Sequence, residues 1–410
     1  MKHKTYLHIV KGGFNVMQGT ELPAARQNNT VMMLTSQGNE TINRADTTQT
    51  IAKEDIIGED ALYDSFQKCI RNVRWKPSVG HLTHHYISEL SKLSSDLYNK
   101  TYKPHKAKLF RITEPKPRDI MSMHIRDRIY LRSLNDNAIY PQITKSLIPD
   151  NFACQKGKGT DPARIRLKEF LYEYYRKNKC QGYRLQIDIH GYYPNMDRSY
   201  AKAVFRKRIE SNLYPMAAEV LDYHPGDVGF NPGDQTIQNV GIAALDDLDH
   251  YVKERLRIRY YIRYMDDSII IHPDKEYLEH CLEEIKVILN RQNMELNPKK
   301  TEIKHIKEPF LFLGFSYRLT ETGKVVIFAD PAKIKHERKK LRRMANHVIS
   351  GQPVIRKKKI IYLTKHDVDC HFKSYKSCIR FGNSRRLIYN LNRYYESLWK
   401  GYKNERILYD

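Results

Sequence analysis

Two adjacent aspartates, Asp266 and Asp267, lie between two apolar runs of the sequence. Residues 260–262 precede them and residues 269–271 follow them, a pattern typical of two buried strands joined as a hairpin. Because successive side chains of a strand point to opposite faces, a turn is needed to present both carboxylates to one place. Like charges held close together repel each other unless a cation lies between them. The pair therefore indicates a divalent metal site, although an isolated pair of this kind would also suit a solvated surface turn.

A third aspartate, Asp188, lies near the end of a predicted strand that begins at Tyr183. Three acids on neighbouring strands can hold two divalent ions about 4 Å apart, the arrangement that stabilises both exchanging oxygens in phosphoryl transfer. Oxygen ligands supplemented by substrate phosphates suit Mg2+, and Mn2+ accepts the same ligands. We therefore expect two Mg2+ ions, with Mn2+ as a substitute. The expected ligands are Asp188, Asp266, Asp267 and the backbone carbonyl of Ile189.

The composition indicates a polyanionic partner. The 410 residues include 71 lysines and arginines against 47 acids, a formal net charge of +24 at pH 7, and the 29 tyrosines suit base stacking. At 40% hydrophobic residues the chain is globular, and its length predicts two or three subdomains. The six cysteines form no CxxC pair, which argues against a zinc ribbon or a disulfide scaffold. With no signal peptide or membrane span visible, we expect a cytoplasmic protein without a membrane partner.

The elements that must position these acids follow from the apolar spacing. The spacing predicts helices over residues 60–97, with breaks at Pro77 and Gly80, and over residues 127–143, 161–171, 197–213, 235–255 and 275–292. Strand pairs are predicted around a proline-rich turn at residues 108–121 and between residues 310–315 and 324–328. A glycine-rich basic loop occupies residues 151–161, and a very basic helix follows Pro331. The predicted fold class is therefore α+β.

Five short motifs occur in order along the middle of the chain. They are Asp188-Ile-His-Gly-Tyr-Tyr, Gly233-Asp-Gln-Thr-Ile-Gln, Tyr264-Met-Asp-Asp, Asn297-Pro-Lys-Lys-Thr and Phe312-Leu-Gly-Phe. Together they resemble the palm motifs of reverse transcriptases, and the resemblance runs from about Ala61 to Ser316. Upstream, Glu114-Pro-Lys-Pro-Arg and Phe152-Ala-Cys-Gln-Lys-Gly-Lys-Gly-Thr resemble the fingers motifs of the bacterial members.

The resemblance implies a right-hand polymerase, with fingers, a palm made of an antiparallel sheet plus helices, and a helical thumb. The implied order is an N-terminal arm or accessory segment over residues 1–55, fingers over 56–180 and the palm over 181–316. A thumb and a basic helical C-terminal region would follow over residues 317–410.

The resemblance also assigns roles to the residues that match its motifs. Asp188, Asp266 and Asp267 would bind the metal ions. Lys300 would protonate the leaving pyrophosphate, with its neighbour Lys299 as the alternative. The nucleotide would contact Lys116 and Arg118 through its triphosphate, Tyr193 through its ribose 2′ position, and Gln238. Nucleic acid would contact Lys156, Lys158, Phe312, Gly314, Lys335, Arg338, Lys339, Arg342 and Arg343. Each of three assignments has a structural alternative. Tyr193 would also suit a core tyrosine, Lys116 and Arg118 a solvated basic turn, and the basic residues after Pro331 a solvated surface helix.

Departures from the family pattern narrow the predicted function. The segment around Gln238 lacks the Pro-Gln-Gly of group II intron and retroviral enzymes, and it is closer to diversity-generating retroelement enzymes and related bacterial groups. We predict an RNA-directed DNA polymerase that makes cDNA from dNTPs on a bound structured noncoding RNA, in phage defence, alone or with a second copy or partner protein. The alternatives are a mutagenic retroelement enzyme, a protein-primed or template-independent polymerase, and an RNA-binding scaffold with a vestigial palm.

Overall fold

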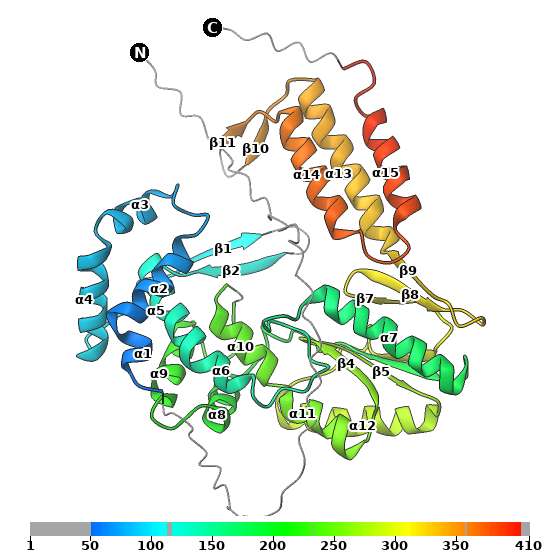
Figure 1. Cartoon of the computed structure of the whole chain (residues 1–410), viewed down its shortest axis with the longest axis horizontal. Coiled ribbons are helices and arrows are strands. Elements are labelled where there is room, and N and C mark those ends of the chain that lie inside the picture. The colour runs from blue at the N-terminus through cyan, green and yellow to red at the C-terminus, as the bar shows by residue number, and fades with distance from the viewer. Residues whose placement is uncertain (1–50, 113–116, 232, 357–358, 403–410) are drawn as a thin grey trace, which may run out of the picture. The chain divides into compact units, whose positions relative to one another are not determined.

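The computed structural model (Figure 1) describes residues 51–112, 117–231, 233–356 and 359–402. Most of the expected N-terminal arm and the expected triphosphate ligand Lys116 lie outside these residues. The described chain forms two compact units. The first contains the residues up to Lys103 together with Ile125–Ser133, and the second contains Pro104–His124 and the residues from Leu134 onward. The segment expected to form the fingers thus contributes to both units.

The first unit is helical. It contains α1 (Glu54–Ile57), α2 (Glu59–Ile70), α3 (Pro77–His84), α4 (Tyr86–Tyr98) and most of α5 (Ile125–Leu134). Its core includes Phe66 of α2, Leu93 of α4 and Ile129 of α5. The helices predicted over residues 60–97 are confirmed. Pro77 begins α3, where its missing N–H costs nothing, but Gly80 lies inside that helix rather than at a break.

The second unit contains a four-stranded antiparallel sheet, which we call the palm sheet. Its order is β4 (Tyr260–Tyr264), β5 (Asp267–His272), β3 (Tyr183–Ile187) and β6 (Glu302–His305). One face packs into a core with α7 (Thr160–Asn178), where Tyr260 lies edge-on to Tyr174. Helix α12 (Lys275–Arg291) also packs on β3, β5 and β6. Because β4 and β5 are buried along most of their length, their sequences are continuous apolar runs rather than alternating ones.

The helix predicted over residues 235–255 is wrong as a single element. The segment divides into α10 (Gln235–Ala243), α11 (Asp246–His250) and a π-helix, η3 (Tyr251–Arg255). The break lies at Leu245, whose ψ of 11° is not helical. Two carboxylates of α11, Asp246 and Asp249, are buried in ion pairs, so the chain turns here to direct them inward. The helix predicted over residues 127–143 is likewise divided into α5, a π-helix η1 (Asn135–Ile139) and α6 (Tyr140–Ile143).

The strands predicted at residues 310–315 and 324–328 form a three-stranded sheet instead of a pair. Its strands are β7 (Phe310–Phe312), β8 (Phe315–Leu319) and β9 (Val325–Ala329), in that order. Leu313 and Gly314 both have positive φ angles, 46° and 82°, so they form a tight turn that splits the predicted first strand.

The other predicted elements of this unit are present with shifted ends. They are the hairpin of β1 (Lys108–Ile112) and β2 (Arg118–Ser122) and the helix α8 (Arg198–Arg208). A short helix α9 (Tyr214–Glu219) and the 3-10 turn η2 (Val220–Tyr223) follow, in a segment for which no element was predicted.

The C-terminal part is a helical bundle. Helices α13 (Pro331–Ile349), α14 (Lys365–Cys378) and α15 (Arg385–Ser397) lie side by side in Figure 1, and a hairpin of β10 (Val354–Arg356) and β11 (Lys359–Ile361) joins the first two. Leu341, Phe372 and Leu391 place one residue from each helix in a shared core. The α+β class is confirmed, and an antiparallel sheet with an acidic hairpin followed by a helical bundle is the right-hand polymerase arrangement. Among the described residues, no helix has the length and apolar character required to cross a bilayer.

Candidate active site

The palm sheet brings the three predicted aspartates to one end. Ile187 pairs with Ser268 across β3 and β5, so Asp188 and Asp267, one residue beyond this pair, lie at the same end of the sheet. Asp266 lies in the turn between β4 and β5, beside Met265, whose φ of 56° closes the turn. The predicted hairpin is therefore confirmed, with Asp266 in its turn and Asp267 as the first residue of β5 rather than a second turn residue.

The acids are close enough to change one another's protonation. Burial first, and then the charges of Asp266 and Asp188, together raise the pKa of Asp267 to about 6. The pKa of Asp266 is also raised, first by burial and then by the charge of Asp188. Nearby cations, Lys300 among them, oppose both shifts. The site therefore concentrates negative charge in a poorly solvated place, where a cation would be strongly favoured.

Asp188 is held by the loop that precedes β6. Lys300 Nζ forms an ion pair with Asp188 Oδ1, and Asn297 Nδ2 donates to Oδ2 at 2.9 Å. The backbone N–H of Asn297 donates to the carbonyl of Asp188 at 2.8 Å. Burial alone would lower the pKa of Lys300, but its bond to Asp188 and the charges of the three carboxylates outweigh burial and raise it. Lys300, rather than Lys299, is thus the lysine directed at the acids.

The predicted metal ligands do not form a preassembled cage. In the portions of the chain that the structure describes, no group of three histidine, cysteine, aspartate or glutamate side chains is arranged to hold a metal ion. Both carboxylate oxygens of Asp188 are bonded to Lys300 and Asn297. Ile189, the expected carbonyl ligand, forms an isolated bridge with Leu296.

Tyr193 lies against the acidic hairpin. Its hydroxyl donates to Met265 Sδ at 3.5 Å, and burial raises its pKa above the ordinary value. A Cβ atom at Gly241 of α10 would lie 2.5 Å from that hydroxyl oxygen, so only glycine leaves the tyrosine room to occupy this place. Gln238, one turn earlier on α10, accepts a contact from Cys154 Sγ at 3.8 Å.

Arg118, at the start of β2, is exposed, and its charge lowers the pKa of Asp266 against the effect of burial. The glycine-rich loop holds its two predicted lysines differently. The ammonium of Lys156 lies 5.2 Å from the centre of the Tyr140 ring. Lys158 Nζ instead donates to the carbonyls of Pro149 and Asn151 at 2.9 and 2.8 Å, which fixes the loop's own backbone.

The remaining predicted contacts lie farther along the chain. Phe312 is buried at the end of β7, and Gly314 lies in the following turn. The basic residues of α13 line two surface hollows: one contains Lys339, Arg342 and Arg343, and the other adds Lys335 and Arg338. The guanidiniums of Arg338 and Arg342 lie 5.2 and 5.9 Å from the ring centre of Tyr394 on α15.

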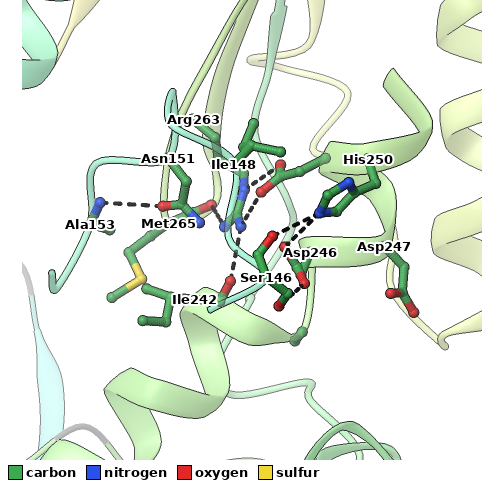
Figure 2. Close-up of polar contacts among 12 residues, drawn as sticks. Ser146, Ile148, Asn151, Ala153, Ile242, Asp246, Asp247, His250, Arg263 and Met265 are labelled. Carbon is green, nitrogen blue, oxygen red and sulfur yellow. Dashed lines mark hydrogen bonds and ion pairs between the residues drawn. The ribbon is translucent and has the colours of Figure 1, made fainter. Parts of the chain in front are cut away.

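Four residues that support the site were not selected from the sequence: Gly241, Asn297, Asp249 and Arg263. Arg263 offered a signal, because a charged residue interrupts the apolar run of β4 and must find a partner if that strand is buried. Figure 2 shows its guanidinium directed toward the backbone of Ile242 and Met265. The identity of the acidic partner, Asp249, depends on how α11 turns and had no comparable signal.

The part of the chain that contains the acidic hairpin is similar to a known protein family. Residues 242–317 match the family described as "Reverse transcriptase (RNA-dependent DNA polymerase)". The match contains Asp266, Asp267 and Lys300, whereas Asp188 precedes it. The group II intron-encoded protein LtrA of Lactococcus lactis subsp. cremoris is 37% identical over 67 residues, which is 16% of this chain and 11% of LtrA. The same protein from strain MG1363 matches equally. The chain therefore aligns with only a small part of these curated relatives, and that part resembles a reverse transcriptase.

Solved structures of telomerases show a distant likeness. A truncated apo telomerase from Candida tropicalis aligns with a TM-score of 0.41 at 14% identity, covering 60% of each chain. Telomerase from Candida albicans, in complex with a TWJ fragment of telomeric RNA, aligns with a TM-score of 0.44 at 10% identity. That alignment covers 72% of this chain and 55% of the telomerase.

Proposed function

We propose that the protein is an RNA-directed DNA polymerase. The observation that carries the proposal is the convergence of Asp188, Asp266 and Asp267 at one end of the palm sheet, where their charges act on one another. A solvated surface turn would not bury its acids or raise the pKa of a carboxyl to about 6. The match of residues 242–317 to reverse transcriptases supports the same chemistry.

The acids fit divalent metal ions by the chemistry of their donors. Carboxylate oxygens are hard ligands that suit Mg2+ or Mn2+, and mutual repulsion among them is relieved by a cation. Bound there, two such ions would stabilise charge on the oxygens that exchange in phosphoryl transfer. Asp188, Asp266, Asp267 and the carbonyl of Ile189 are the proposed ligands. Lys300 and Asn297 would then release oxygens of Asp188.

The other residues act on the nucleotide. Lys300 retains its proton beside the carboxylates, which raise its pKa, and we assign it the proton taken up by the leaving pyrophosphate. Tyr193, fixed between Gly241 and Met265, is assigned to exclude a ribose 2′-hydroxyl. Lys116 and Arg118 are assigned to the triphosphate, because an ammonium and a guanidinium suit phosphate oxygens. Gln238 completes the nucleotide site.

Nucleic acid would lie along the basic bundle that we call the thumb, α13–α15. Lys335, Arg338, Lys339, Arg342 and Arg343 of α13 are assigned to phosphates, which such residues contact without reading sequence. Lys156, Lys158, Phe312 and Gly314 are assigned to the template and primer. The proposed template is a structured noncoding RNA and the proposed role is phage defence, which rests on the sequence departures from intron and retroviral enzymes.

The proposal is tested with the purified chain, an RNA template carrying a DNA primer, dNTPs and Mg2+. The double variant Asp266→Ala with Asp267→Ala should lower nucleotide incorporation by about 1,000-fold or more. It removes two proposed ligands of the metal ions, which would supply several kcal/mol of charge stabilisation in the transition state. Glu279→Gln, which alters an exposed ion pair with Lys275 on α12, is the control and should leave incorporation unchanged.

Unchanged DNA synthesis by the double variant would contradict the proposed function. RNA binding by the wild-type chain without any incorporation would instead favour an RNA-binding scaffold.

A further inference from the structure

The catalytic hairpin rests on a buried ion pair. Arg263, in the strand that leads to the acids, and Asp249 of α11 are both fully buried. Arg263 Nε donates to Asp249 Oδ1 at 2.7 Å and Nη2 donates to Oδ2 at 2.6 Å, a two-pronged pair of the kind that fixes orientation. Tyr261, two residues earlier on β4, adds a hydroxyl bond to Asp249 at 2.6 Å.

The remaining guanidinium donors hold two carbonyls. Arg263 Nη1 donates to the carbonyl of Met265 at 2.9 Å, and Nη2 also donates to the carbonyl of Ile242 in α10 at 2.9 Å (Figure 2). Met265 is the turn residue directly before Asp266, and its positive φ is uncommon for a side chain of its size. One side chain therefore ties the turn that carries the acids to the helix that carries Gly241.

Helix α11, which carries Asp249, is itself held in place by contacts with the rest of this unit. At the other end of α11, Asp246 accepts a bond from Ser146 Oγ at 2.6 Å and an ion pair from Arg208 at 3.2 Å. His250 Nε2 bonds to the carbonyl of Ser146 at 2.8 Å. A short helix anchored at both ends gives the ion pair a rigid base.

The backbone of Arg263 extends the connection to the glycine-rich loop. Its N–H donates to the carbonyl of Asp150 at 3.1 Å, and its carbonyl accepts from the N–H of Phe152 at 3.0 Å. The loop that contains Lys156 and Lys158 therefore begins on the strand of the catalytic hairpin.

Stability alone gives little reason to bury such a pair. Removing two charges from water costs several kcal/mol per ion, and apolar replacements of similar volume are often as stable. A guanidinium, however, can hold two backbone carbonyls and a carboxylate at once in a fixed plane, which an apolar side chain cannot do.

We propose that Arg263 is a positioning residue, which with Asp249 holds the Met265 carbonyl and so sets the position of Asp266 and Asp267 for catalysis. The inference rests on the proposed polymerase function. We assign Arg263 no contact with substrate; it acts through the turn at Met265. A lysine in its place keeps the charge but has no planar fork, so it cannot make the same set of bonds.

The matched control is Arg184. It is also fully buried, lies on β3 of the same sheet and forms an ion pair with Glu302 at 2.9 Å. Its described hydrogen bonds go to Glu302 and Gln186 rather than to the hairpin turn. Arg184→Lys therefore reports what a lysine does at a buried, ion-paired arginine of this sheet, whose partner Glu302 is partly exposed, without disturbing the acids.

Arg263→Lys and Arg184→Lys are compared at a temperature where thermal unfolding shows both to be folded. Arg263→Lys should lower kcat by about 100-fold, the effect of displacing reacting groups by about 1 Å, with a much smaller change in KM for dNTP. Arg184→Lys should leave kcat little changed. Equal kcat values for the two variants would overturn the inference.

Two further measurements separate positioning from folding and from the polymerase proposal. Amide hydrogen exchange should accelerate over residues 260–268 in Arg263→Lys only; the same exchange there in both variants would also overturn the inference. Hydrogen exchange can be compared even if the wild-type chain makes no DNA. Absence of DNA synthesis would reject the proposed polymerase function, not the positioning role of Arg263. The apolar double variant Arg263→Met with Asp249→Leu should fold yet keep the low kcat, whereas recovery of kcat would reduce the pair to a stabilising role.

Discussion

The palm hairpin and the thumb helix α13 both gather charge, but they hold it in opposite ways. The acids at the end of the palm sheet are partly or fully withdrawn from water: Asp188 is buried and bonded to Lys300 and Asn297, and the pKa values of Asp266 and Asp267 are raised. On α13, Lys335, Lys339, Arg342 and Arg343 are exposed along a surface. The thumb spreads its charge along a surface, whereas the palm concentrates charge at a point.

The difference predicts how each region responds to substitution. Electrostatic interactions are strong where water is excluded and weak where charges are solvated and screened. A single change in the palm should therefore abolish activity, whereas a single change on α13 should produce a small and salt-dependent loss.

Asp188→Asn should have the largest effect. The amide keeps the shape of the side chain but removes the charge that pairs with Lys300 and contributes to the proposed metal site. Incorporation should fall by about 1,000-fold, measured by single-turnover primer extension. Asp161→Asn, which alters the pair between an exposed carboxylate and Arg164 at the start of α7, is the control. Activity of Asp188→Asn within a few-fold of wild type would remove Asp188 from the site.

Tyr193→Ala should relax discrimination against ribonucleotides. Without the ring, the space beside Gly241 and Met265 would admit a 2′-hydroxyl, and the preference for dNTP over NTP should fall by about 10- to 100-fold. Tyr193→Phe keeps the ring and should keep the preference. The ratio of kcat/KM for the two nucleotides measures the effect, and equal ratios for all three proteins would assign Tyr193 to the core alone.

Asp267→Asn should stabilise the fold at neutral pH. The pKa of Asp267 is about 6 in the folded chain against an ordinary value of 3.8, so the folded state binds the extra proton between these values. Wild-type stability should therefore fall as pH rises from about 4 to about 6, and remain lower above that. The variant lacks this loss and should gain about 1–3 kcal/mol at pH 8 over wild type.

Urea denaturation without divalent ions at pH 4 and pH 8 measures the gain. Glu283→Gln, which removes an exposed charge on α12, should show no such pH dependence. A gain of equal size at both pH values would show that charge burial is not its cause.

The double variant Lys339→Ala with Arg342→Ala should have the smallest effect. Binding of an RNA–DNA duplex should weaken moderately, and the slope of log affinity against log salt should decrease by about 1 for each phosphate contact removed. Lys286→Ala, at an exposed position of α12, should leave the slope unchanged. An all-or-none loss of binding would show that α13 contributes more than charge.

Much of the fold could be predicted because its signals are local. The apolar runs around Asp266 and Asp267 define the hairpin, and Pro331 with the following apolar spacing defines α13. Predictions failed where long-range contacts outweighed local periodicity. The break at Leu245 allows α11 to direct Asp249 into the core. The turn at Leu313 and Gly314 is instead a local feature that the strand pattern did not reveal, and it divides the predicted strand into β7 and β8.

Local sequence alone specified which chemical groups are available: three aspartates, a following lysine and a basic C-terminal helix. It did so because strand and helix periodicities are set by neighbouring residues. The tertiary structure decided that β3 pairs with both β5 and β6, which brings Asp188 to Asp267 and Lys300. It also decided that Arg263 finds Asp249. These pairings join residues far apart in the chain. They form only after the sheet and helices have packed, because packing decides which partner each buried charge can reach.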